Sequence, residues 1–295
     1  MLNSPTPEVI AGPACRLGES PVWDPAGRAL WWIDVWGRAL HRLSLADDAL
    51  ARWELPALPG CVLPVADGRL LVALADGLCA FDPSTGSLES LGSPPPSGGR
   101  YNDGFVDRAG QLWIGTVESS PGAADGALYR WSEAGGSEPV VAGLATPNGL
   151  ALSPDGGTLY FTVTERRQIL AYDVDPASGR LSERGPVVTD TDCYPDGLVV
   201  SADGTLWSAK WDGWRVSRYA PDGRLLDEIG FPVPNVTSLT FGGPAHDRLF
   251  VTTASEDTVR TSPGREADAG RLFVVDGTGA VGQPDTVLDR LPLRG

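Results

Sequence analysis

The sequence has 295 residues and a formal net charge of −15 at pH 7. So acidic a chain lacks the basic face that displaces counterions from a phosphate backbone, which argues against binding to nucleic acid or to an anionic membrane. Hydrophobic residues make up 42% of the chain, which excludes an intrinsically disordered protein and supplies a large core.

The cysteines and the N-terminal residues bear on the cellular compartment. Cys15, Cys61, Cys79 and Cys193 show no Cys-x-x-Cys spacing and are too few for a disulfide framework, so we interpret them as reduced thiols. The segment 1–5 lacks the basic and apolar regions of a signal peptide, and no window is apolar enough for a membrane span. We therefore expect a cytoplasmic protein, a monomer or weak homo-oligomer.

A short hydrophobic strand recurs along the whole sequence at intervals of 40 to 47 residues. In chain order, the six copies of this anchor strand are Leu30–Trp32, Leu70–Val72, Leu112–Ile114, Leu159–Phe161, Leu206–Ser208 and Leu249–Val251. A period in the forties is typical of β-propeller blades, and the six copies span nearly the entire chain.

Further strands are predicted on both sides of the anchors. Gly149–Ser153 and Gly197–Ser201 precede their anchors and are joined to them by tight Asp-Gly type turns. Gln168–Asp173 and Trp214–Tyr219 follow theirs and alternate with the two-residue period of a half-buried strand. We therefore predict an all-β fold, a six-bladed β-propeller with four-stranded antiparallel blades, formed as one domain over residues 1–295.

Oxygen-bearing side chains occupy one equivalent position in four of the six units. Counted eight residues before the hairpin-turn glycines Gly27, Gly110, Gly156 and Gly204, this position holds Glu19, Asn102, Asn148 and Asp196. The innermost strands of a propeller converge on its central axis, so these side chains should face one another in the channel. Carboxylate and amide oxygens suit a hard cation such as Ca²⁺, Mn²⁺ or Mg²⁺, which would also relieve the repulsion between the two carboxylates.

A simpler interpretation is that these residues belong to turns. It fits Asn148 and Asp196, because Asn and Asp before Gly are common in turns. It is weaker for Glu19 and Asn102, and their recurrence at the same register favours a functional site. The corresponding residue of the second unit is Gly60, so not every blade contributes.

Other motifs argue against competing chemistries. His41 and His246 are the only histidines, and neither falls at the convergent position, so we expect no metal cluster built from His and Cys. The chain has no Gly-x-Ser-x-Gly elbow and no phosphate-binding P-loop motif. Four tryptophans in strand segments are expected to pack between blades rather than to stack on nucleic-acid bases: Trp23, Trp32, Trp113 and Trp207.

Four motifs together resemble one known family. Leu17–Trp23, Arg100–Gly104, Pro147–Leu150 and Tyr194–Gly197 look like those of senescence marker protein (regucalcin), gluconolactonase and luciferin-regenerating enzyme. The resemblance extends over nearly the whole chain, with the motifs in the right order. It implies that the protein is a metal-dependent enzyme acting on a sugar lactone.

The resemblance also implies the metal ligands, which are Glu19, Asn148 and Asp196. Three protein oxygens leave positions open for water or substrate, which is typical of a catalytic site. Ca²⁺ is favoured, with Mn²⁺, Zn²⁺, Mg²⁺ and Fe²⁺ as alternatives, and the ion would act as a Lewis acid on the lactone carbonyl. Either Asp196 takes the proton of the attacking water as general base, or hydroxide on the metal is the nucleophile.

Substrate contacts follow from the same resemblance. The family's Arg-x-Asn-Asp-Gly motif holds substrate hydroxyls, which implies Arg100 and Asn102. A further family glutamate contacts substrate, and here Glu118 follows Gly115–Val117 directly, earlier than the family usually has it, so the preferred sugar stays open. The expected reaction is hydrolysis of a sugar lactone to the aldonic acid. A metal-dependent hydrolase of another ester-like bond, such as a phosphotriester, and a non-enzymatic calcium- or ligand-binding propeller are the alternatives.

Overall fold

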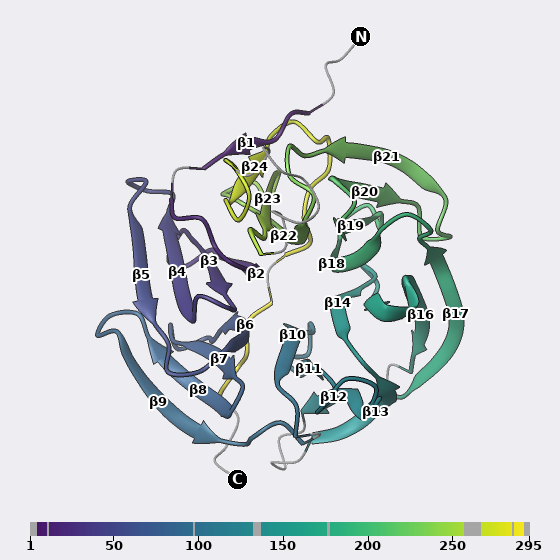
Figure 1. Cartoon of the computed structure of the whole chain (residues 1–295), viewed down its shortest axis with the longest axis horizontal. Helices are drawn as coiled ribbons and strands as arrows, with labels where there is room; N and C mark the ends of the chain where they lie inside the picture. The colour runs from purple at the N-terminus through teal and green to yellow at the C-terminus, as the bar shows by residue number, and fades with distance from the viewer. Residues whose placement is uncertain are drawn as a thin grey trace.

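Six four-stranded antiparallel sheets are arranged in a ring (Figure 1). The prediction of a six-bladed β-propeller is thereby confirmed. Residues 1–4, part of the segment in which the sequence shows no signal peptide, lie outside the part of the chain that the structure describes. This computed structural model describes residues 5–10, 12–96, 98–131, 137–175, 178–256, 267–284 and 286–291.

Blades 1 to 3 each use four consecutive strands, ordered from the channel outwards. They are β2 (Gly18–Asp24), β3 (Ala29–Asp34), β4 (Ala39–Ser44) and β5 (Leu50–Glu54); β6 (Pro59–Pro64), β7 (Leu70–Leu74), β8 (Gly77–Asp82) and β9 (Ser87–Gly92); and β10 (Tyr101–Val106), β11 (Leu112–Thr116), β12 (Gly126–Trp131) and β13 (Ser137–Leu144).

Blades 4 and 5 repeat this order, whereas blade 6 takes its outermost strand from the other end of the chain. The strands are β14 (Pro147–Leu152), β15 (Thr158–Val163), β16 (Gln168–Val174) and β17 (Leu181–Thr189); β18 (Tyr194–Val200), β19 (Leu206–Trp211), β20 (Arg215–Tyr219) and β21 (Leu225–Gly230); and β22 (Val236–Gly242), β23 (Arg248–Thr253), β24 (Phe273–Val275) and β1 (Glu8–Val9). Within the described ranges the only helix is the 3₁₀ turn η1 (Thr164–Arg166), and none is long and apolar enough to cross a membrane.

Strand β1 closes the ring. Glu8 lies opposite Val274 and Val9 opposite Phe273, so the first strand of the chain completes the sheet that holds β24. The amide of Ile10 continues this contact by donating to the carbonyl oxygen of Leu272, at 2.8 Å. The sequence repeat does not predict this closure, because a two-residue strand is too short to show periodicity.

The core lies mainly between neighbouring blades. The predicted anchors form the second strand of each blade, and their side chains are almost entirely buried. Trp31 of blade 1, for example, packs edge-on against Phe81 of blade 2 with ring centroids 6.2 Å apart. The four tryptophans predicted to pack between blades are all buried, and so are the four cysteines, none of which is in a disulfide.

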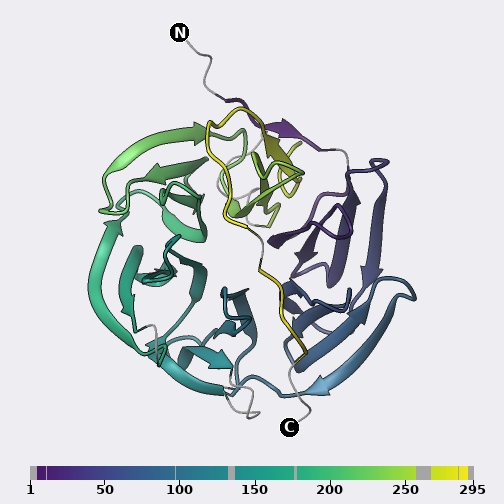
Figure 2. The same cartoon turned by 180° about the vertical axis from the view of Figure 1, so that it is seen from behind.

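A C-terminal strap, formed by residues 282–284 and 286–288, crosses one mouth of the ring (Figure 2). Gln283 Nε2 donates to the carbonyl oxygens of Leu152 and Val200, at 2.8 and 3.0 Å. Thr286 Oγ1 donates to the carbonyl oxygen of Val106. Because these carbonyls belong to β14, β18 and β10, the strap covers the channel at the ends of the innermost strands. The starts of those strands lie at the opposite end.

Candidate functional site

A β-bulge at the start of the innermost strands aims the predicted site residues into the channel. In β10, β14 and β18 the pairing with the next strand skips two residues, beginning at Asn102, Asn148 and Asp196. In β2 the skip begins directly after Glu19. Because a bulge interrupts the strict alternation of a strand, it can turn these side chains inward. For Asn102, Asn148 and Asp196, the predicted convergence is therefore built from one irregularity that recurs in three blades.

The glycines that follow two of these residues do not form turns. Gly149 and Gly197 lie inside β14 and β18, without the positive φ that favours glycine in turns. They are needed for close approach of neighbouring blades. A Cβ at Gly149 would lie 2.4 Å from the amide nitrogen of Leu198, and one at Gly197 would lie 2.4 Å from Oγ of Ser238. The simpler turn interpretation of these pairs is therefore wrong.

Three carboxyl groups meet at this end of the channel. Burial, followed by the charges of Asp196 and Asp103, holds the pKa of Glu19 well above its ordinary value. Burial and the charge of Asp103 do the same for the pKa of Asp196. Burial raises the pKa of Asp103 itself to about 6. The three groups therefore repel one another when ionised, and they carry this cost unless a cation offsets it.

Asp103 is the member of this cluster that the sequence did not single out. It follows Asn102 directly, and in a regular strand adjacent side chains point to opposite faces. Both residues fall within the bulge of β10, so this alternation does not hold there. The sequence signal that could have revealed Asp103 is the pair of adjacent oxygen-bearing side chains, Asn102 and Asp103, in a segment that forms a bulge.

The side chain of Asn148 is fixed by its neighbours. Its amide nitrogen donates to Oγ1 of Thr164 at 3.0 Å, and its oxygen Oδ1 accepts from Nδ2 of Asn102 at 2.9 Å. Thr164 in turn donates to the carbonyl oxygen of Pro195, at 2.8 Å, and so connects Asn148 to the strand that holds Asp196. The hydrogen bonds orient the amide so that its oxygen, which keeps a second lone pair, is available as a ligand.

Arg100 and Asn102, the predicted substrate residues, are in direct contact. Arg100 Nη1 donates to Oδ1 of Asn102 at 2.7 Å and to the carbonyl oxygen of Tyr101 at 3.0 Å. Burial lowers the pKa of Arg100, while the nearby charge of Glu19 acts in the opposite direction. A guanidinium group thus lies beside the carboxylate cluster, at the place where the resemblance implies substrate binding.

Glu118 holds its own loop together. Its Oε1 accepts from the amide of Gly122 at 3.0 Å, and its Oε2 accepts from the amide of Ala124 at 2.9 Å. The amide of Glu118 also donates to the carbonyl oxygen of Ala145, at 2.9 Å. A contact between the Glu118 carboxylate and substrate stays a prediction, and it requires the carboxylate to share or exchange one of these bonds.

The donor set fits a divalent cation. Asp196 Oδ1 is buried and has no hydrogen-bond partner among the described residues, which is costly for a carboxylate oxygen unless something else satisfies it. Glu19, Asp103 and Asn148 add further oxygen donors, the type that Ca²⁺, Mg²⁺ and Mn²⁺ prefer. The residues proposed as ligands therefore suit the group that the family resemblance implies.

A second cluster corrects one expectation. The structure brings ligand atoms of Cys15, Asp34 and His41 within 4.8 Å of one another, whereas the sequence predicts no cluster of His and Cys. Burial raises the pKa of Cys15 to about 12 and lowers that of His41 to about 4, so both are neutral at pH 7. The Asp34 carboxylate accepts backbone amides of Arg16 and Leu17, which gives the cluster a structural role.

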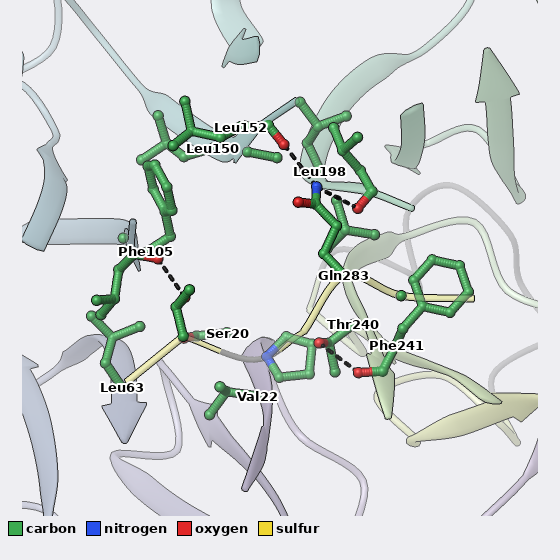
Figure 3. Close-up of a pocket in the computed structure, with 18 of the residues that line it drawn as sticks. Ser20, Val22, Leu63, Phe105, Leu150, Leu152, Leu198, Thr240, Phe241 and Gln283 are labelled. Atoms are coloured by element: carbon green, nitrogen blue, oxygen red, sulfur yellow. Dashed lines mark hydrogen bonds between the residues drawn. The ribbon is translucent and has the colours of Figure 1, made fainter. Parts of the chain in front are cut away.

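Behind the carboxylates lies a chamber of about 210 Å³. Figure 3 shows its wall, which includes Leu63, Phe105 and Leu198 from the innermost strands. Gln283 of the C-terminal strap lies across it, and Asp103 lines its other end. The wall between the two ends is largely apolar, and Asp107, Arg108 and Gln283 add polar side chains at the strap end.

The chain is similar to known lactonases over nearly its whole length. The chain is 35% identical over 288 residues to pentonolactonase XacC of Haloferax volcanii, covering 94% of this chain and 96% of that protein. It is 34% identical to an L-arabinolactonase of Azospirillum brasilense, with 90% of each chain covered.

Solved structures show the same fold. A luciferin-regenerating enzyme superposes with a TM-score of 0.90 at 27% identity, covering 97% of this chain and 100% of that one. A calcium-binding protein, regucalcin, from Agrobacterium tumefaciens gives 0.84 at 31% identity, with 96% and 97% covered. Residues 17–255 match the family model described as SMP-30/Gluconolactonase/LRE-like region. The resemblance seen in the sequence is therefore confirmed, and the chain belongs to the SMP-30/gluconolactonase/LRE-like family.

Proposed function

We propose that the protein hydrolyses a sugar lactone to the corresponding aldonic acid with the help of one divalent cation. The observation that carries this proposal is the meeting of Glu19, Asp103 and Asp196 at the channel end, with a buried Asp196 oxygen that has no hydrogen-bond partner in the described part of the chain. The names of the relatives support the reaction class, since two of them are a pentonolactonase and an L-arabinolactonase.

The cation would be held by Glu19, Asn148 and Asp196, with Asp103 close by. When bound, it supplies Lewis-acid polarisation of the lactone carbonyl. Asn102 keeps Asn148 in position through the hydrogen bond between their side chains. Ca²⁺ is the favoured ion, because all of these donors are hard oxygens.

Asp196 is the proposed general base. One of its carboxylate oxygens accepts a proton from the water that attacks the lactone carbonyl carbon, while the other is the proposed cation ligand. A bond forms between the water oxygen and that carbon, the ring C–O bond breaks, and the same proton passes to the ring oxygen as it leaves. The product is the open-chain acid, so Asp196 ends each cycle in the state in which it began.

Arg100 and Asn102 are the proposed substrate contacts. The guanidinium group carries five donors in a rigid fork, which suits two neighbouring hydroxyl oxygens. Nη1 of Arg100 donates to Oδ1 of Asn102 and to the carbonyl oxygen of Tyr101, which fixes the plane of the guanidinium group beside the carboxylates. Glu118 is proposed to complete the binding site from its loop. A cytoplasmic location is proposed as well, in keeping with a small sugar lactone as the substrate.

The decisive experiment compares cation-free with cation-loaded protein. Chelated protein should hydrolyse pentono- and gluconolactones no faster than the spontaneous reaction, and Ca²⁺, Mn²⁺, Zn²⁺, Mg²⁺ or Fe²⁺ should restore activity to different degrees. Full activity in protein shown to be free of metal would contradict the proposal. Turnover of a phosphotriester but of no lactone would support the other hydrolase. Cation binding without turnover of either would identify a binding propeller.

A further inference from the structure

We propose that Trp36 is a stacking platform for the sugar ring and determines which lactone the protein prefers, an inference that rests on the proposed function. Trp36 lies in the turn between β3 and β4. This turn is at the same end of the channel as Glu19, because Asp34 at the end of β3 pairs with Gly18 at the start of β2. The Trp36 side chain is 38% exposed and is the only aromatic among the exposed large hydrophobic residues of the described ranges.

A continuous row of contacts connects Trp36 to the proposed ligands. The guanidinium carbon of Arg100 lies 5.9 Å from the centre of the Trp36 ring. Arg100 donates to Asn102 at 2.7 Å, and Asn102 donates to Asn148 at 2.9 Å. Trp36 therefore stands at the outer end of a row that begins at the cation site. A lactone whose carbonyl faces that site would extend its hydroxylated ring toward Arg100 and Trp36.

The backbone that carries Trp36 is braced although its side chain is exposed. Asp34 Oδ1 accepts the amide of Gly37 at 2.9 Å, which fixes the turn. Arg16 donates through Nη1 to the carbonyl oxygen of Trp36 at 3.3 Å, and it forms an ion pair with Glu256 at 3.1 Å. A turn held in place before the ligand arrives loses little conformational freedom on binding.

The chemistry of the indole ring suits a cyclic polyol. Its face is broad and apolar, with a negative quadrupole that attracts polarised C–H groups. A sugar lactone directs hydroxyls outward from its ring and exposes C–H groups on its faces. Because the Arg100 guanidinium lies over one face of the Trp36 ring, the lactone can stack on the other face while Arg100 binds the hydroxyls at the edge of the lactone ring. Because epimers differ in which face bears an uninterrupted set of C–H groups, stacking also discriminates among them.

Steady-state kinetics of Trp36→Ala, Trp36→Leu and Trp36→Phe on gluconolactone and its galacto and manno epimers test this role. Alanine and leucine should raise KM for the best substrate about tenfold, leave kcat within about twofold and narrow the spread of kcat/KM among epimers. Phenylalanine should retain most of the affinity. Leu225→Ala, at a side chain 49% exposed on β21, is the control and should change nothing. Unchanged KM and spread in Trp36→Ala, or full recovery in Trp36→Leu, would overturn the proposal.

A binding measurement separates this inference from the proposed function. 1,5-Anhydro-D-glucitol has a hydroxylated ring but no lactone carbonyl, and it should bind the cation-loaded protein about tenfold more tightly than it binds Trp36→Ala. If this difference is found but no lactone is hydrolysed, the proposed function fails while the role of Trp36 stands. If lactones are hydrolysed, but the polyol binds the parent and Trp36→Ala equally or binds neither of them, only the role of Trp36 fails.

Discussion

The side-chain amide of Asn102 donates a hydrogen bond to the side-chain oxygen of Asn148, 2.9 Å away in the next blade. Asn102→Ala removes this donor and leaves Asn148 less firmly oriented, so we expect the Kd for the cation to rise at least about tenfold. Calcium titration of the chelated protein measures the change. Gln283→Ala, in the strap at the far end of the channel, should leave the Kd unaltered. An unchanged Kd in Asn102→Ala would mean that Asn148 needs no such support.

Glu19→Gln and Asp196→Asn should each abolish lactone hydrolysis and at the same time stabilise the cation-free protein. Each change removes a charge from a group of carboxylates that repel one another, while keeping the size of the side chain. Activity assays and thermal melts in a chelator report the two effects. A variant that lost activity and also melted earlier without the cation would indicate a structural role instead.

The cation-free protein should become less stable as the pH rises through the range set by Asp103. Folded Asp103 keeps its proton up to about pH 6, whereas in the unfolded chain the pKa is near 3.8. The folded state therefore binds more protons at Asp103 between these values, and this group alone lowers the free energy of unfolding by roughly 3 kcal/mol as the pH rises.

Urea unfolding of Asp103→Asn and of the parent, in a chelator across this pH range, measures that contribution as a difference. His41 adds a slope of opposite sign to both proteins, because its folded pKa is about 4 and its ordinary value is 6.5. The comparison cancels this slope. Parallel stability curves for the two proteins would show that Asp103 does not titrate as described.

Arg100→Ala should raise KM for sugar lactones more than it lowers kcat. If the guanidinium group binds hydroxyls away from the reacting carbonyl, it stabilises the bound substrate and the transition state equally. Its removal then raises KM and leaves kcat nearly unchanged. A simple lactone without hydroxyls should barely respond. Equal losses of kcat/KM on both substrates would mean that Arg100 stabilises the transition state or the folded structure instead.

A stability prediction concerns the buried ion pair of blade 5. Lys210 Nζ lies 2.7 Å from Asp190 Oδ2 with 0% and 6% of the two side chains exposed, and it lies 5.0 Å from the centre of the Tyr219 ring. Lys210→Met leaves Asp190 buried without its partner and should cost about 3–5 kcal/mol, which the further change Asp190→Leu should largely restore.

Urea unfolding measures both variants of the Lys210 pair. Arg248→Met is the matched control, because it breaks an exposed ion pair with Asp276 and should cost less than about 1 kcal/mol. A similar cost at Lys210 and Arg248 would mean that water reaches the buried pair.

The propeller is predictable from the sequence because the anchors repeat with one period, and four positions at the starts of innermost strands are predictable because each lies eight residues before a hairpin-turn glycine. Register counting identifies Asn148 and Asp196 in this way. It does not identify Asp103, because regular alternation would point that side chain away from Asn102. Contacts between distant segments leave no periodic signal, so the position of Gln283 across the channel is not predictable from the sequence. The hydrogen bonds that the Glu118 carboxylate accepts from Gly122 and Ala124 lie within one irregular loop, which has no periodic pattern either.

The pairing of β1 with β24 sets the order in which the protein can assemble. Because Val9 of β1 pairs with Phe273 of β24, the ring stays open until β24 has been synthesised, and contacts so distant in sequence form slowly. Glu19 follows β1 closely, whereas Asp196 lies in blade 5. The carboxylates therefore meet only when the ring shuts. A cation that needs both carboxylates as ligands would bind only the closed ring. By mass action, it would stabilise the closed ring against the open one.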